Sequence, residues 1–194
     1  PLRFNMCVHR LGGTSVVITG SGAVYDIEVG NLVDNGSSGT VVASVVTGAA
    51  LDAANNVSVG STSTDNTITR DTTSPSVTVD QAVGQADPTN AATVSFTVVF
   101  SEPVIGFAQA DVSLGGTAVA SATMVVTGSG TTYNLAVSNL AANGTITASV
   151  PAGGALDAAG NANVASTSTD NTITRDTASP SVTVNQAVGQ ADPS

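Results

Sequence analysis

"STSTDNTITRDTTSP" occupies residues 61–75, and "STSTDNTITRDTASP" occupies residues 166–180. The two strings agree at fourteen of fifteen positions and lie 105 residues apart. A period of this length is the size of one small domain, not of a short structural repeat. The sequence is therefore expected to hold copies of one module, and the repeated string marks the place where one module ends and the next begins.

This spacing predicts the module boundaries. We expect residues 1–70 to be the C-terminal part of a module, residues 71–175 to be a complete module, and residues 176–194 to hold the first strand of a following module. Residues 1–10 are atypical, because they stand where the complete copy has "SEPVIGFAQADVS". We interpret the chain as a segment of a longer array of such modules.

The composition excludes several classes of partner. Four Lys and Arg residues stand against fourteen Asp and Glu, which gives a net charge of −10. Nucleic-acid binding is disfavoured because no basic patch is available to displace counterions from phosphates. An anionic membrane surface would repel the chain, and no apolar run approaches the ~20 residues needed to span a bilayer. A single Cys rules out an internal disulfide.

Alternating hydrophobicity predicts strands with one wet face. "TVSFTVVF" (93–100) and "TYNLAVS" (132–138) place apolar residues at every second position. In the first copy the matching stretch "VYDIEVG" (24–30) keeps the inward positions apolar and changes the outward ones to Asp26 and Glu28. This difference between the copies supports a strand that is buried on one side only.

Further strands are expected at 76–80, 111–114, 119–126, 145–150 and 166–175. "TGSGTTY" and "ANGT" predict turns, because Gly supplies backbone conformations with positive φ. About seven short strands in one module, with turns at regular spacing, indicate an all-β fold of two packed antiparallel sheets. A closed barrel is the alternative.

The order of these motifs resembles a known family. The marks are the leading "DTTSP" (71–75), "FSEPV" (100–104) after the second strand, and "LDAAGN" (156–161) before the last one. In combination they resemble the bacterial immunoglobulin-like repeats of very large surface proteins. The resemblance covers residues 71–175 fully, residues 11–70 as the C-terminal part of a module, and residues 176–194 as the start of another.

The resemblance implies tandem immunoglobulin-like β-sandwiches in an exported protein at the bacterial cell surface. It implies a stalk or adhesive segment whose partners are the neighbouring modules of the same chain, with a host or surface ligand bound by other domains. It also implies Ca²⁺, since several such repeats bind this ion near the junctions between modules. A carbohydrate-binding module, or an accessory segment of a secreted hydrolase, is the alternative function.

Four residues are candidates for a Ca²⁺ site. In a sandwich of this kind, the loops after the second and sixth strands share the pole where the chain enters, so Asp71, Glu102, Asp157 and Asn161 are expected to converge. Ca²⁺ prefers six to eight hard oxygen ligands, and carboxylates gathered around one point repel each other without a cation. The alternative is a tight turn in which Asp157 and Asn161 cap backbone amides, and a linker capped by Asp71.

Catalysis finds little support in the sequence. Cys7 and His9 would share a face of a strand, but no third group orients them as a nucleophile and base. Glu102 and Asp111 read as solvated loop acids and not as an acid/base pair. The sequence therefore predicts a protein that is not an enzyme.

Overall fold

The computed structural model describes residues 15–30, 32 and 38–192. The chain divides into two compact units. Pro1–Pro75 and Leu156–Ala162 form the first unit, and Ser76–Ala155 and Asn163–Ser194 form the second unit. All pairings between the strands of the described residues are antiparallel. The predicted all-β antiparallel fold is confirmed.

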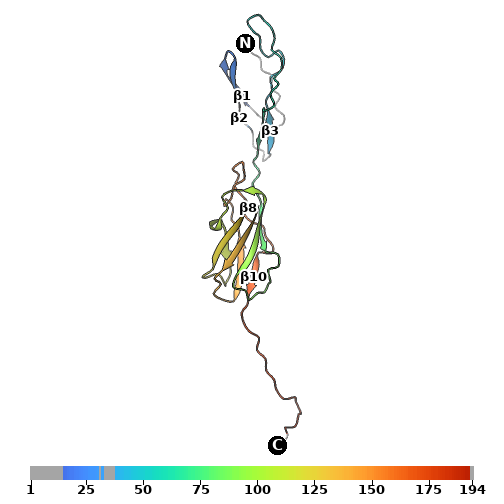
Figure 1. Cartoon of the computed structure of the whole chain (residues 1–194), viewed down its shortest axis with the longest axis vertical. Coiled ribbons are helices and arrows are strands. Elements are labelled where there is room, and N and C mark those ends of the chain that lie inside the picture. The colour runs from blue at the N-terminus through green and yellow to red at the C-terminus, as the bar shows by residue number, and fades with distance from the viewer. Residues whose placement is uncertain (1–14, 31, 33–37, 193–194) are drawn as a thin grey trace. The chain divides into compact units, whose positions relative to one another are not determined.

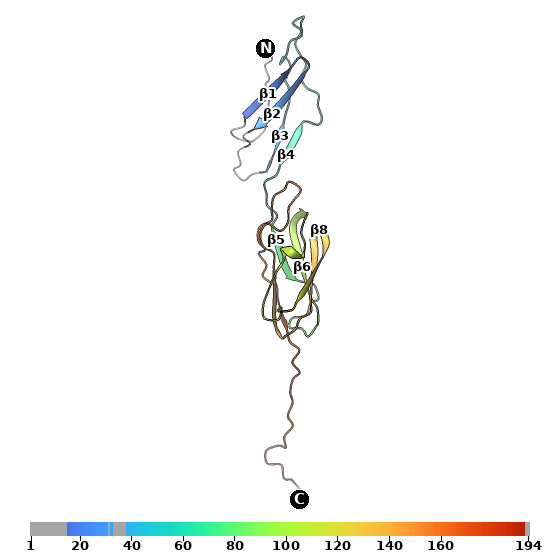
Figure 2. The same ribbon diagram turned by 90° about the vertical axis from the view of Figure 1, so that its left-hand side faces the viewer.

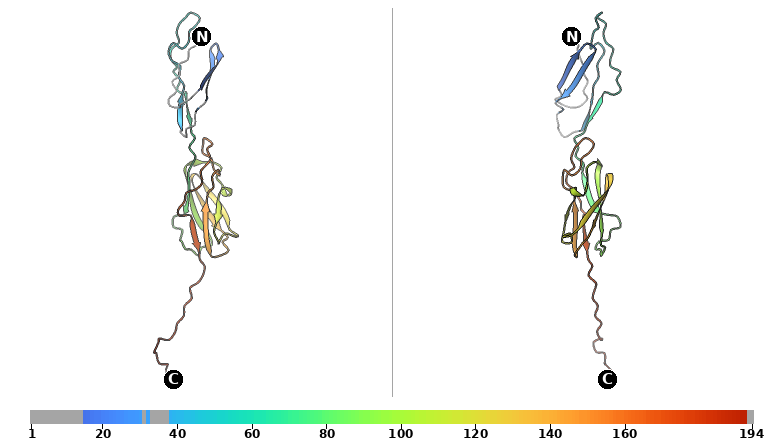
Figure 3. Two further views of the ribbon diagram at one scale, coloured as in Figure 1. Left: turned by 180° about the vertical axis from the view of Figure 1, so that it is seen from behind. Right: turned by 60° about the vertical axis from the view of Figure 1, so that its left-hand side comes forward.

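The second unit contains two three-stranded sheets (Figure 1). One has the order β5-β6-β8, with β5 at Val77–Gln81, β6 at Val94–Val104 and β8 at Thr123–Ser138. The other has the order β10-β9-β7, with β10 at Thr172–Arg175, β9 at Gly144–Ser149 and β7 at Ser113–Gly115. Figure 3 shows β10 (red) beside β9 (orange), with which it pairs.

The core of the second unit confirms the predicted alternation. The inward residues of β6, Val94, Phe96, Val98 and Phe100, are at most 2% exposed. The inward residues of β8 behave in the same way: Leu135 and Val137 are fully buried and Tyr133 is 7% exposed. The rings of Phe100, Phe107 and Tyr133 pack edge to face, with centroids 4.9–5.9 Å apart. Burial of this continuous apolar face is the main favourable contribution to the folding of the second unit.

The predicted turn at "TGSGTTY" lies in the middle of β8. The ends of this strand meet, because the hydroxyl oxygens of Thr123 and Ser138 are 3.0 Å apart. The chain therefore bends back on itself near Gly130, whose φ of 69° suits glycine. The matching stretch of the first copy forms two separate strands. Counted as two arms, β8 brings the second unit to seven strands, as the sequence predicts.

The predicted strand at 166–175 is too long, since only residues 172–175 form β10. The amide of Ser166 donates to the carbonyl of Val150 at the end of β9. The amide of Thr167 instead donates to the carbonyl of Val77 in β5. Residues 166–171 thus divide their hydrogen bonds between the two sheets, so they continue neither ladder.

Two other predicted strands are displaced. The 3₁₀ turn η1 at Gln109–Asp111 occupies the start of the stretch predicted as 111–114, and β7 follows it. The carboxylate of Asp111 accepts a hydrogen bond from the amide of Ala108 and closes this turn. The stretch predicted as 119–126 begins with a turn in which the amide of Ala122 donates to the carbonyl of Val119, and β8 starts only at Thr123.

The first unit consists of two antiparallel pairs among its described residues (Figure 2). β1 (Ser15–Ser21) pairs with β2 (Val24–Gly30), and β3 (Gly39–Val42) pairs with β4 (Thr67–Arg70). The positions of β2 expected to face inward are Tyr25, Ile27 and Val29. Tyr25 and Val29 are half-buried, and Ile27 is 37% exposed. The inward face exists, but it is only partly covered.

Residues 176–192 follow β10 without forming a strand, although "SVTV" at 181–184 repeats the start of β5. A strand needs a partner for its backbone groups, and β5 has β6. The described residues also contain no helix with the length and apolar character that crossing a membrane requires.

Candidate functional site

The loop at residues 156–161 is built around one aspartate. Oδ1 of Asp157 accepts hydrogen bonds of 2.8 Å from the amides of Ala159 and Asn161, and Oδ2 accepts one of 2.8 Å from the Asn161 side chain. Gly160 has a φ of 91°, which allows the tight return of the chain. Asp157 is 2% exposed, so these bonds replace the water that its carboxylate has lost.

The first copy repeats this loop. Asp52 accepts the same three bonds, from the amides of Ala54 and Asn56 and from the Asn56 side chain, each at 2.8 Å. Asn55 takes the place of Gly160 with a φ of 67°. The predicted turn with a capping aspartate and a left-handed residue is therefore present in both copies.

Asp71 caps the segment that follows β4. Its Oδ1 accepts a hydrogen bond of 2.6 Å from the Ser38 hydroxyl and one of 2.9 Å from the Thr73 amide. Its backbone carbonyl accepts a hydrogen bond of 3.2 Å from the side chain of Asn161, so the two candidate residues contact each other directly.

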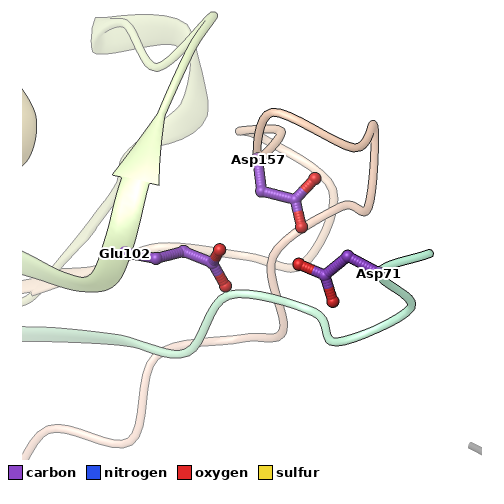
Figure 4. A group of neighbouring side chains, drawn as sticks. All are labelled: Asp71, Glu102 and Asp157. Carbon is purple, nitrogen blue, oxygen red and sulfur yellow. The ribbon is translucent and has the colours of Figure 1, made fainter. Parts of the chain in front are cut away.

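The structure brings three of the predicted ligands together. The carboxylate oxygens of Asp71, Glu102 and Asp157 lie within 4.8 Å of one another, and Figure 4 shows the three carboxyl groups directed toward a common point. Asp157 is buried, and the other two are half-buried. Asn161 adjoins this group through its amide nitrogen, which donates to Asp157 and to the Asp71 carbonyl. All four predicted residues thus form one cluster.

Hydrogen bonds keep two of these carboxyl groups ionised. The hydrogen bond from the Asn161 side chain holds the pKa of Asp157 below its usual value, although burial acts in the opposite direction. The Ser38 hydroxyl, followed by the Thr73 amide, lowers the pKa of Asp71 in the same way. The cluster therefore concentrates negative charge at neutral pH.

The donor set of the cluster fits Ca²⁺. Three carboxylates supply hard oxygen atoms, which this ion prefers over nitrogen or sulfur. A carboxylate has about four lone-pair positions, and Asp157 uses three of them on the amides of its own loop. The same hydrogen bonds orient the carboxylate, as outer-shell partners do in metal sites.

The other sequence candidates are placed differently. Asp111 closes η1 through its bond to Ala108 and is not part of the carboxylate cluster. Cys7 and His9 lie outside the described residues.

Sequence reasoning missed the polar residues that hold the chain segment following β4 in the first unit and the one following β10 in the second. Ser38 bonds to Asp71, and its hydroxyl also lies 2.9 Å from that of Thr73. At the matching place 105 residues later, the Asn143 side chain donates to Asp176 at 3.0 Å. The available signal was positional: in both copies a short polar residue precedes the Gly-Thr that opens the neighbouring strand.

Comparisons with known proteins give one finding. Residues 71–174 match a protein-family model described as a bacterial Ig-like domain. The match covers more than half of the 194 residues and includes all four residues of the cluster. No curated protein and no solved structure gave a match.

Proposed function

Because this chain belongs to the bacterial Ig-like domain family, we propose that it is a structural segment of a bacterial surface or secreted protein, acting as a spacer in an adhesive stalk. The identified domain is of a non-catalytic kind, and domains of this family are typical of surface proteins. We place the module boundaries at 70/71 and 175/176, so that the partners of each module are its neighbours in the chain.

The observation that carries this proposal is a repeated set of hydrogen bonds in the segment that follows the last strand of each copy. We call this segment, residues 71–73 in the first copy and 176–178 in the second, the joint. Oδ1 of Asp71 accepts the amide of Thr73, and Oδ1 of Asp176 accepts the amide of Ala178 at 2.8 Å. Each aspartate is also bonded to a polar side chain from the loop that precedes the neighbouring strand, Ser38 or Asn143. A chain that leaves each copy in the same fixed conformation is suited to holding modules at a constant spacing.

The second joint has two further bonds of the same kind. The amide and the hydroxyl of Thr177 both donate to Oδ1 of Asn143, at 3.0 and 2.6 Å. The exit from β10 is therefore tied to the loop before β9 by side chains as well as by the strand ladder. A flexible linker would instead be rich in Gly and Ser without such contacts.

The alternative of a carbohydrate-binding module has less support. Such sites commonly present exposed aromatic rings as platforms, whereas Phe96, Phe100, Phe107 and Tyr133 are all buried in the core of the second unit. These rings are not available to a sugar. We therefore favour the spacer.

We further propose that Asp71, Glu102 and Asp157 bind Ca²⁺, with Asn161 as a fourth member of the site. The close approach of three carboxylates supports this proposal, since their mutual repulsion is relieved by a cation. Bound Ca²⁺ would supply positive charge and tie together chain segments far apart in the sequence. The Asp71 carboxylate is held by hydrogen bonds from Ser38 and Thr73, so its contribution to Ca²⁺ binding depends on these two bonds.

The spacer is tested by measuring distances between spin labels in a Cys7→Ser background. Labels at Val24→Cys on β2 and Val99→Cys on β6 occupy exposed positions, with side chains 73% and 41% exposed. A narrow distribution of distances is expected for a stiff spacer. A distribution as broad as that of a flexible tether would overturn the proposal.

The metal site is tested separately by thermal unfolding with millimolar Ca²⁺ and with chelator. An ion that binds only the folded state must raise the melting temperature. We expect Ca²⁺ to stabilise the wild-type chain and the Asp52→Ala variant, but not Asp157→Ala. Asp52 is the matched control, because its loop has the same three hydrogen bonds but is absent from the cluster. An unchanged melting temperature of the wild type would refute the metal site and leave the spacer in place.

A further inference from the structure

The first arm of β8 is the outer strand of one sheet in the second unit. The sheet has the order β5-β6-β8, and the part of β8 that pairs with β6 is its second arm, residues 130–137. The first arm, residues 123–127, folds back along the second, as the contact between the Thr123 and Ser138 hydroxyl groups shows. Among the described residues no other strand pairs with it, and β8 lies on the side of the sheet away from β5 (Figure 2). Its outer backbone groups are therefore available to an added strand.

This edge has none of the side chains that usually protect an exposed strand. Natural proteins place Lys, other charged residues or Pro on such edges to prevent pairing between molecules. The first arm reads "TMVVT" and contains no residue of these types. Met124 and Val126 pack against the core, whereas Val125 is 54% exposed on the outer face between the exposed Thr123 and Thr127. The edge is thus apolar at its centre and has a hydroxyl group at each end.

Charge is absent from a long stretch of sequence around this edge. Residues 112–156, which include all of β7, β8 and β9, contain no Asp, Glu, Lys, Arg or His. In the sheet β5-β6-β8 the charged residues are Asp80 on β5 and Glu102 on β6. The whole chain has a net charge of −10, so two copies repel each other wherever their acidic surfaces approach. The β8 edge is a place where two copies can meet without bringing carboxylates together.

The first copy of the module has the same pattern on the matching strand. β1 begins with "SVVIT" (15–19), again three apolar residues between two hydroxyl residues and again without charge. The neighbouring strand β2 has Asp26 and Glu28 where the second copy has Ala136 and Asn134. Charge has therefore been introduced beside this strand in one copy, and on the strand itself in neither.

We propose that the first arm of β8 pairs with the same arm of a second copy of this chain. The strand is self-complementary in antiparallel register about Val125. Thr123 then lies opposite Thr127, Met124 lies opposite Val126, and the two Val125 residues lie opposite each other. Every pair joins like side chains, which are the favourable cross-strand combinations. The same patch is used on both copies, so the pairing closes as a two-fold dimer.

The dimer has two consequences for a chain of tandem modules, and both rest on the proposed spacer function. Antiparallel strands make the two chains run in opposite directions, so a stalk pairs with one that points toward it. Five residues from each copy form a small interface, and we expect a single contact to have a dissociation constant of roughly 10–1000 μM. Modules held at a constant spacing would repeat this contact along the chain and strengthen it by multivalency.

Sedimentation velocity of the full chain at concentrations up to about millimolar tests the pairing, with reductant present so that Cys7 does not link copies. We expect a dimer, and V125D is expected to associate at least about tenfold more weakly, because it places two carboxylates opposite each other in place of the valine contact. V83D is the matched control. It makes the same change in charge at a fully exposed position away from the edge, and is expected to associate like the wild type.

Cysteine crosslinking in a Cys7→Ser background tests the register without weakening the pairing. Residues directly opposite in an antiparallel pair have Cα atoms about 4.5–5.5 Å apart, which a disulfide can span. We therefore expect Val125→Cys to crosslink two copies rapidly when diamide is added. Thr123→Cys is the matched variant, exposed on the same face, but its two copies would lie about 13 Å apart along the strands and are expected not to crosslink.

Three outcomes would overturn the proposal. A wild-type chain that stays monomeric up to about millimolar concentration would exclude the dimer. Association of V125D equal to that of V83D would place the contact elsewhere on the molecule. Crosslinking of Thr123→Cys as fast as that of Val125→Cys would show collision without a fixed register. Each outcome leaves the spacer in place, because the spin labels measure its stiffness within one chain.

Discussion

The sequence "TITR" forms the last strand of both units, yet its isoleucine has opposite environments in the two. Ile68 on β4 is 70% exposed, whereas Ile173 on β10 is fully buried. The two stretches of "SVTV" differ in the same way, since the valines of β5 are buried and those at 182 and 184 are exposed. A local sequence therefore determines the capacity to form a strand, and the opposite sheet determines whether its apolar face is covered.

The source of the difference is the sheet that contains β5 and β6. In the second unit β6 contributes five buried residues to the core, and Ile173 belongs to the same buried cluster. In the first unit the described residues contain the hairpin β1–β2 and the pair β3–β4, but no counterpart of β5 and β6. The face that Ile68 shares with Val29 and Val41 lines a cavity instead of a packed core.

The largest expected effect comes from truncating the two isoleucines. Ile173→Ala is expected to destabilise the second unit by about 3–4 kcal/mol, because it removes buried methyl groups and leaves a cavity in a well-packed core. Ile68→Ala is expected to cost less than about 1 kcal/mol, because most of that side chain already contacts water. Both changes in the free energy of unfolding are measured by denaturant unfolding. Far-UV circular dichroism follows the transition, because the chain contains no Trp.

The pair is informative because the two substitutions are made in identical local sequences. Strand propensity changes equally in both variants. The difference between their free energies of unfolding therefore reports only how far the rest of each unit buries the isoleucine side chain. Equal costs at the two positions would contradict the interpretation that the first unit has an open face.

A smaller effect is expected on the acid side of the stability curve. The folded-state pKa of Asp157 is lowered, chiefly by the Asn161 side chain, from a usual value of 3.8. Its contribution to stability is therefore complete above about pH 4 and is lost as the pH falls through the lowered pKa. The Asp157→Asn variant should therefore lose less stability than the wild type as the pH falls. Melting temperatures from neutral pH to about pH 2 measure this difference.

Asp52→Asn is the matched variant, because the pKa of Asp52 is also lowered, chiefly by the Asn56 side chain. Asp52 lies in an exposed loop, where water screens the same hydrogen bonds, so a smaller difference is expected. An Asp157→Asn variant with the acid limb of the wild type would show that other groups govern acid unfolding.

Sequence reasoning succeeded where one physical effect dominates. The period-two pattern at 93–100 predicts the buried face of β6, because each inward residue meets the core. The meeting of Asp71, Glu102 and Asp157 followed from sandwich topology, which places distant loops at one pole. Both inferences need only the order of the strands and their alternation.

The failures occurred where neighbours outside the local sequence decide. Residues 166–171 have strand-like composition, but they lie against both sheets and join neither ladder. The exposure of Ile68 could not be read from "TITR", because the same letters are buried in the other copy. Ser38 was missed because its role depends on a bond to a residue 33 positions away.

The smallest effect is expected from exchanging the left-handed residues of the two aspartate loops. Gly160 has a φ of 91° and Asn55 a φ of 67°, and an added Cβ at Gly160 would meet no atom within 4 Å. Gly160→Asn should therefore cost at most about 1 kcal/mol, since Asn tolerates this region, whereas the β-branched Gly160→Val should cost about 2 kcal/mol or more. Asn55→Gly should change stability by less than about 0.5 kcal/mol, because relief of backbone strain offsets the added freedom of the unfolded chain. Melting temperatures of the three variants test this order. If Gly160→Asn were as costly as Gly160→Val, the two loops would differ in their backbone requirement despite having the same hydrogen bonds.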